Sequence, residues 1–267
     1  MKSYKRYSKL LYRLYVRILI SPFILYSILF LRKKELKIIS GADSSHFRSL
    51  LQLINSIKIF EKGKIKVLVY DLGLTKDETA FLSLLHPDIQ LRRFEYEKYP
   101  SSYNININSG NYAWKPAIIY EEYFSMSKNN MLFWLDAGCF VKKPLSLVRA
   151  SIHFTGFYSP FGGGTNKNWT HYKTIERLGL KGEEDKKMLA SGIVGLKTGF
   201  IRNDKLVKSW YQASQIEEII APAGSSKDNH RQDQSLLSLL YYNAYKLSKP
   251  PLISHKGLEI LAHKDIG

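Results

Sequence analysis

The chain has 267 residues but only one cysteine, Cys139. A single cysteine excludes an intramolecular disulfide, and it excludes a zinc site built from several cysteines. A chain of this length buries most of its unfolded surface, so it needs neither device to hold a core. We interpret Cys139 as a small apolar residue of a buried strand, because nothing beside it in the sequence would activate a thiol.

Several signatures of other enzyme classes are also missing. The sequence contains no G-x-S-x-G, no Walker phosphate loop, no G-x-G-x-x-G and no H-E-x-x-H. These patterns mark, in order, α/β-hydrolases, P-loop nucleotidases, dinucleotide-binding enzymes and metalloproteases. Their absence leaves the catalytic class to be read from less specific features.

Acidic residues are scarce, and the net charge is +17. Such a charge favours an anionic partner: nucleic acid, anionic lipid or a phosphorylated substrate. Residues 1–40 alone carry +9 of it, beside an apolar segment. Because no nucleic-acid-binding motif accompanies the charge, we expect no nucleic acid partner.

A long uninterrupted apolar run is absent as well. The apolar segment Leu10–Leu31 is broken by Arg13 and Arg17, and its uninterrupted part, Ile18–Leu31, has 14 residues. A bilayer span needs about 20. We therefore interpret residues 1–35 as a basic, apolar helix lying on the anionic cytoplasmic surface of a membrane, with residues 36–267 as a cytoplasmic domain. A single span and a helix packed on its own domain are the alternatives.

Residues 36–267 alternate between strand-like and helix-like segments. This order predicts an α/β fold with a mostly parallel twisted sheet and helices on both faces. Residues 156–170, which include three consecutive glycines, read as a long loop that could act as a lid. Strands are expected at 36–40, 65–70, 89–94, 131–135 and 190–196, and helices at 46–59, 76–85, 114–124, 207–220 and 233–245.

Aspartates follow three of the expected parallel strands: Asp43, Asp71 and Asp136. Ligands of such sheets bind outside the carboxyl ends of the strands. Asp136 is the main candidate, because the small residues after it, up to Gly138, let a diphosphate approach the backbone, and its carboxylate suits Mg²⁺ or Mn²⁺. Each aspartate also has a structural alternative, a turn or a helix cap.

The segment Trp134-Leu135-Asp136-Ala137-Gly138 resembles the metal-binding strand end of GT-A fold glycosyltransferases. The resemblance extends over residues 36–245. Further segments similar to that superfamily are Ser40-Gly41-Ala42-Asp43, Val69-Tyr70-Asp71-Leu72-Gly73-Leu74, Trp114-Lys115-Pro116, residues 190–195 and Arg231-Gln232-Asp233-Gln234-Ser235-Leu236-Leu237.

The resemblance implies a nucleotide-sugar donor, with a UDP-sugar expected, and a divalent cation, Mn²⁺ or Mg²⁺. Asp43 would lie near the base or ribose, and Lys115 near the donor phosphates. Asp136 and Gly138 would contact the donor. Asp136 and His255 would be metal ligands, and Asp233 and Gln234 would face the acceptor hydroxyl as catalytic residues.

One position departs from the superfamily pattern. The usual motif is Asp-x-Asp, and both carboxylates serve the metal, whereas this chain has Gly138 in third place. We predict a glycosyltransferase that moves a sugar from a nucleoside-diphosphate sugar to a glycan or lipid-linked acceptor at a membrane, in surface polysaccharide synthesis. The alternative, favoured by Gly138, is a non-catalytic membrane subunit of the same fold that binds a glycan or a partner enzyme.

Overall fold

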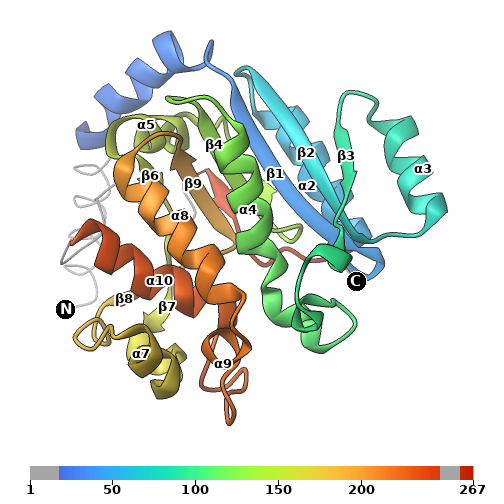
Figure 1. Cartoon of the computed structure of the whole chain (residues 1–267). Helices are drawn as coiled ribbons and strands as arrows, with labels where there is room; N and C mark the ends of the chain where they lie inside the picture. Colours follow the sequence, from blue (N-terminus) through green and yellow to red (C-terminus); the bar gives the residue numbers. More distant parts are fainter. Residues whose placement is uncertain (1–17, 247–258, 267) are drawn as a thin grey trace, which may run out of the picture.

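The computed structural model describes residues 18–246 and 259–266, which surround a central six-stranded sheet (Figure 1). Its strand order is β3-β2-β1-β4-β9-β6. The pairs β3–β2, β2–β1 and β1–β4 are parallel, and β9 and β6 are antiparallel additions. The predicted mostly parallel sheet is confirmed. The six strands are β1 (Leu36–Asp43), β2 (Ile65–Gly73), β3 (Gln90–Arg93), β4 (Met131–Leu135), β6 (Phe157–Tyr158) and β9 (Ile193–Lys197).

Strand β4 is buried along its whole length, and its side chains alternate between two cores. Leu132 and Trp134 join the core under α4, α8 and α10, whereas Phe133 and Leu135 join the core under α2 and α5. Helices therefore cover both faces, as predicted (Figure 1). The helices are α2 (Phe47–Phe60), α3 (Lys76–Leu85), α4 (Trp114–Ser125), α5 (Ser146–Thr155), α6 (Asn166–Trp169), α7 (Tyr172–Leu178), α8 (Ile201–Ser214), α9 (Glu217–Ile220) and α10 (Gln232–Tyr245), with short turns η2 (Ser44–His46), η3 (Tyr96–Lys98), η4 (Ser101–Tyr103) and η5 (Asn108–Tyr112).

Residues 156–170 do not form the long loop that their composition predicts. They contain β6, then β7 (Phe161–Thr165), then α6. Strand β7 pairs antiparallel with β8 (Lys187–Leu189), a partner too distant in sequence for composition to reveal. This strand passes close to the start of α10, since a Cβ at Gly162 would lie 2.7 Å from Nε2 of Gln234.

The first described residues pack against α5. Residues 18–26 are helical and continue into the π-helical turn η1 (Ser27–Leu31). Leu31 is fully buried, and the rings of Phe23 and Phe154 meet at 5.6 Å. Within the described ranges, no helix is both long enough and apolar enough to cross a bilayer. The first 17 residues of the predicted membrane helix lie outside these ranges.

The C-terminal segment, residues 259–266, forms a separate two-stranded sheet with residues that follow β4. Strand β10 (Ile260–Leu261) pairs antiparallel with β5 (Phe140–Val141). Just before β10, the buried Glu259 carboxylate accepts hydrogen bonds from the backbone N–H groups of Leu147 (2.7 Å) and Val148 (3.1 Å) in the first turn of α5. Burial raises the pKa of Glu259 to about 7 from an ordinary 4.5. The folded chain thus holds this proton more tightly than the unfolded chain.

This shift predicts how stability depends on pH. Glu259 contributes most stability below its unfolded pKa, and the contribution is lost as pH rises through about 7. Between pH 5 and 8 the native chain should therefore lose about 2–3 kcal/mol more unfolding free energy than Glu259→Gln. Urea unfolding of both proteins at the two pH values measures this difference. Parallel pH profiles for the two proteins would contradict it.

Candidate active site

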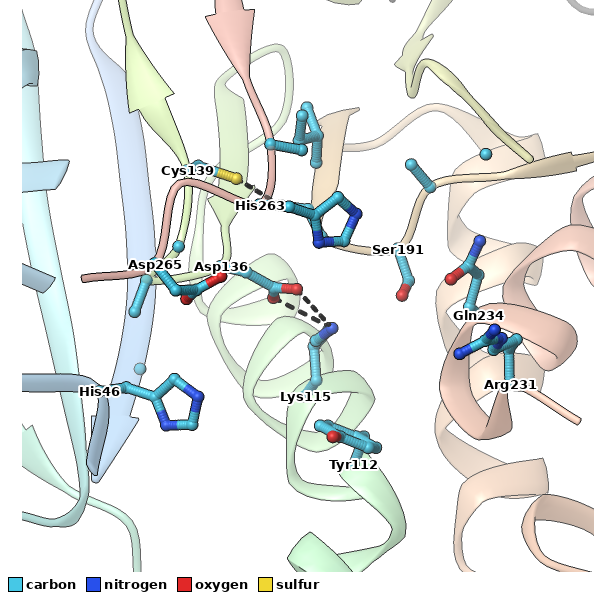
Figure 2. A pocket seen from close by; sticks show the side chains of 18 of the residues that line it. His46, Tyr112, Lys115, Asp136, Cys139, Ser191, Arg231, Gln234, His263 and Asp265 are labelled. Carbon is cyan, nitrogen blue, oxygen red and sulfur yellow. Dashed lines mark hydrogen bonds and ion pairs between the residues drawn. The ribbon is translucent and has the colours of Figure 1, made fainter. Parts of the chain in front are cut away.

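A cavity of about 550 Å³ opens where β1 and β4 end (Figure 2). It brings together residues from the starts of α4 and α10, from the turn after β4 and from the C-terminal segment. Five of the residues singled out in the sequence line it: Asp43, Lys115, Asp136, Gly138 and Gln234. His255 lies outside the described residues, so its predicted role as a metal ligand stays a prediction.

Asp136 owes its position to the alternation of β4. Leu132 and Trp134 face α4, and Asp136 continues on that side just past the strand end. The indole Nε1 of Trp134 donates to Oδ1 of Asp136 at 2.6 Å. A Cβ at Gly192 would lie 2.6 Å from Oδ2, so the facing backbone closes on the carboxylate from the other side. Asp136 is held in one orientation, with its carboxylate at the cavity wall.

Lys115 lies in the first turn of α4 and is 2% exposed. Its Nζ is 3.0 Å from Oδ1 of Asp136, a contact marked in Figure 2, and 3.0 Å from Oδ2 of Asp233. Burial lowers the pKa of Lys115, but the two carboxylates together raise it above its ordinary value. Lys115 is therefore a fixed ammonium ion at the cavity wall.

Asp233 and Gln234 are neighbours in the first turn of α10, but they face different ways. Asp233 does not line the cavity: it is 4% exposed, and its carboxylate is turned onto Lys115. Burial raises the pKa of Asp233, and the Lys115 ammonium opposes that rise. Gln234 does line the cavity, and its Nε2 donates to the carbonyl of Leu189 at 2.7 Å. Of the two predicted catalytic residues, only Gln234 is placed to touch a ligand.

Asp43 combines the two roles considered for it. It caps η2, accepting from the backbone N–H of His46 at 3.2 Å, and it also lines the cavity. Its hydrogen bond with the His46 ring lowers the pKa of Asp43 to about 2 and raises that of His46. Asp71 lies outside this cavity and accepts from the N–H groups of Gly73 and Leu74, as its interpretation as a turn residue requires.

A left-handed turn precedes α4. All five residues of Asn108–Tyr112 have φ between 47° and 59°. Left-handed backbone costs roughly 1–2 kcal/mol per non-glycine residue and is rarely consecutive. Ser109 and Tyr112 line the cavity, so this strained turn delivers side chains to the site. A Cβ at Gly110 would lie 2.9 Å from the carbonyl carbon of Tyr103, which explains the glycine.

Two lining residues, His263 and Asp265, are not marked by any local motif, because only the pairing of β10 with β5 brings the C-terminal segment to the cavity. Ser191 also lines the cavity, from the turn before β9, and it belongs to the segment 190–195 that resembles the superfamily. Throughout residues 18–246 and 259–266, no group of three or more His, Cys, Asp or Glu side chains is arranged to hold a metal ion.

Comparison with known proteins identifies the fold. Residues 11–120 match a protein-family model described as a protein of unknown function, DUF1647. No curated protein sequence matches the chain. Among solved structures, the galactosyltransferase LgtC, as an active-site mutant, is 14% identical with a TM-score of 0.54, covering 77% of this chain and 70% of LgtC.

Two further glycosyltransferases share the architecture. The bifunctional glycosyltransferase WbbM is 13% identical with a TM-score of 0.53, covering 79% of this chain. This chain spans 38% of the length of WbbM. Mouse xyloside xylosyltransferase 1 is 8% identical with a TM-score of 0.51, covering 80% of this chain and 83% of that enzyme. The GT-A-like fold implied by the sequence motifs is confirmed, and identities this low show the fold alone.

Proposed function

We propose that this chain is a glycosyltransferase that binds a nucleoside-diphosphate sugar, with UDP-sugar the expected class, and transfers the sugar to a glycan or lipid-linked acceptor. The observation that carries the proposal is the buried ammonium of Lys115. It is held against Asp136 at the wall of a cavity that opens at the strand ends of a GT-A-like fold. Such an ammonium can attract an anionic donor, and it can stabilise the negative charge of a diphosphate that leaves the sugar carbon.

The cavity favours a diphosphate on electrostatic grounds. Lys115 lies in the first turn of α4 and Gln234 in the first turn of α10, so both helices direct their amino-terminal ends at the site. Helix amino termini attract anions. The guanidinium of Arg231, stacked 4.2 Å over the ring of Trp169, adds a second cation to the lining. The volume of about 550 Å³ lies in the range of small-molecule sites.

The transfer reaction breaks the bond between the anomeric carbon and the diphosphate oxygen and forms one from that carbon to the acceptor oxygen, whose proton passes to the released diphosphate or to solvent. Negative charge then grows on the departing diphosphate, and a preorganised cation lowers the cost of that charge. Lys115 supplies such a cation without rearranging, because Asp136 and Asp233 already fix it. Gln234 is a neutral amide, so it orients a sugar hydroxyl by hydrogen bonding and does not remove its proton. A divalent cation, when bound, would neutralise the diphosphate further.

Isothermal titration calorimetry with UDP, GDP and CDP, each with and without MnCl₂, tests the proposal. We expect saturable binding of at least one nucleoside diphosphate, and weaker binding of the matching monophosphate, because the second phosphate carries the additional charge. Absence of binding for all three nucleotides under both conditions would refute the donor assignment.

We also propose that the chain associates with an anionic membrane surface. Three apolar side chains of the amino-terminal helix support this proposal. Leu25, Leu29 and Phe30 are 57%, 54% and 57% exposed. The exposed Lys33 and Lys34 follow them. Apolar side chains beside lysines are typical of an interfacial helix on anionic lipid. The cytoplasmic location expected from the sequence stays a prediction.

Vesicle sedimentation checks this association. The triple variant Leu25→Ser, Leu29→Ser, Phe30→Ser should bind vesicles containing phosphatidylserine at least tenfold more weakly, since each lost side chain removes about 1.5–3 kcal/mol of apolar burial. Leu84→Ser is the matched control, because Leu84 is 83% exposed but lies on α3. Equal binding by the triple variant and the native chain would contradict a membrane role for this helix.

A non-catalytic role is the second candidate, and Gly138 is the observation that favours it. A subunit that binds a glycan or a partner enzyme would need neither donor turnover nor Asp136. It would keep its biological activity in Asp136→Ala, provided that the variant is folded.

A further inference from the structure

The space beside Gly138 that a side chain of residue 138 would use is occupied by a side chain from a distant part of the sequence. In the GT-A motif this position carries the second aspartate. A Cβ built on Gly138 would lie 2.6 Å from Cγ of Asp265 and 2.6 Å from its Oδ2. The carboxylate of Asp265 therefore occupies the space that a side chain at 138 would use. Figure 2 shows the carboxylates of Asp265 and Asp136 beside one another.

The chain around Asp265 is fixed on both sides. The backbone N–H of Lys264 donates to the carbonyl of Gly138 at 2.8 Å, and that of Ile266 donates to Oγ of Ser49 at 2.9 Å. Upstream, β10 is paired with β5. Three separate contacts thus place this aspartate over the turn after β4, so its approach to Gly138 follows from the fold.

Asp136 and Asp265 act on the same surroundings. Both line the cavity, and the negative charge of each raises the pKa of His46, although the hydrogen bond that the His46 ring makes to Asp43 has the larger effect. Two carboxylates that line one cavity repel each other, and a bound cation relieves that repulsion.

The donor set fits Mg²⁺ or Mn²⁺ better than a softer metal. Carboxylate oxygens are hard ligands. Magnesium is usually held by one or two carboxylates together with substrate phosphates and water, and not by a complete protein cage. Since no three-residue metal cluster exists among the described residues, two carboxylates plus a diphosphate is the arrangement that this cavity can offer.

We propose that Asp265 supplies, from the C-terminal segment, the second acid that the Asp136-Ala137-Gly138 motif lacks, so that Asp136 and Asp265 together hold a divalent cation on the donor diphosphate. This inference rests on the proposed function, because the diphosphate completes the coordination. It also predicts that the cation binds tightly only when the nucleotide is present.

The test measures Mn²⁺ binding rather than catalysis. Free Mn²⁺ is followed by electron paramagnetic resonance in the presence of UDP, or of whichever of UDP, GDP and CDP binds. Asp265→Asn should weaken nucleotide-dependent Mn²⁺ binding at least tenfold. Asp77→Asn should leave it unchanged, because Asp77 is exposed on α3 and does not line the cavity. Circular dichroism confirms that each variant is folded.

A swap of the acid tests its position directly. Gly138→Asp alone should bind Mn²⁺ poorly, since its Cβ collides with Asp265. Gly138→Asp combined with Asp265→Gly puts the acid back at the motif position and should restore Mn²⁺ binding to within about threefold of the native chain. Recovery of Mn²⁺ binding in the double variant would show that the single variants lose binding through the position of the acid and not through unfolding.

The outcomes separate the two proposals. If nucleotide binds but Mn²⁺ binding is the same in Asp265→Asn and the native chain, the inference is overturned and the proposed function stands. If Asp265→Asn binds nucleotide more tightly without metal, Asp265 obstructs the site and the inference is also overturned. If no nucleotide binds the native chain at all, the proposed function fails and this inference fails with it.

Discussion

Lys115→Met should destabilise the protein by about 3–5 kcal/mol, the usual cost of leaving a buried charge without its partner. Asp233 is 4% exposed, and its Oδ2 lies 3.0 Å from Nζ of Lys115. Asp136, at the cavity wall, can be reached by water and adds less to the penalty. The same substitution removes the cation proposed to face the diphosphate, so donor binding should be lost as well. Urea unfolding measures the first effect, and calorimetry with the nucleotide measures the second.

A double variant separates stability from binding. Lys115→Met with Asp233→Asn removes the stranded charge, so it should recover more than half of the lost unfolding free energy but none of the nucleotide affinity. Lys181→Met is the matched control, because Lys181 is exposed between α7 and β8, and its substitution should change stability by less than about 0.5 kcal/mol. A single Lys115→Met variant as stable as the native chain would show that Asp233 does not depend on this ion pair.

Asp136→Asn should reduce sugar transfer about 100-fold or more while leaving the protein folded. Asparagine keeps the shape of the side chain, so its amide oxygen can still accept from Nε1 of Trp134, and Lys115 keeps Asp233 as a partner. What disappears is the negative charge that holds Lys115 at the cavity wall and that would bind a cation. The kcat/KM for the preferred donor measures the loss.

The comparison variant for Asp136→Asn is Asp185→Asn. Asp185 is exposed before β8 and does not line the cavity, so its loss should leave kcat/KM within about twofold of the native value. Full transfer activity in Asp136→Asn would remove Asp136 from the mechanism, and it would favour the non-catalytic interpretation of Gly138.

Local sequence predicted the fold well where local chemistry determines the structure. Helix α3 has its predicted bounds, and its start is determined by a capping box in which Thr75 and Glu78 make reciprocal bonds of 3.2 and 2.8 Å. Strand β4 also has its predicted bounds. Prediction was poorest for residues 156–170, because the pairing of β7 with β8 depends on a contact between distant segments.

The residues of the candidate site also divide into those set by local sequence and those set by contacts between distant segments. Asp43 ends β1, Asp136 follows β4, and Lys115 and Gln234 lie at helix starts, so hydrophobic periodicity together with the family resemblance could locate them. Asp265 could not be found in this way, since only the docking of the C-terminal segment brings it to Gly138. The sequence locates Asp233 but not its orientation, because it does not show that the carboxylate turns onto Lys115 and away from the cavity.

The most direct test of the central claim is donor turnover by the native chain. The protein is incubated with UDP-, GDP- and CDP-sugars, with and without MnCl₂ and glycan acceptors, and released nucleoside diphosphate is measured while the product anomer is determined. The proposed function predicts release from one nucleotide class, stimulated by Mn²⁺ and at least about 100-fold lower in Asp136→Asn. No release from any donor by a folded native chain that nevertheless binds a nucleoside diphosphate would contradict the assignment of transferase activity.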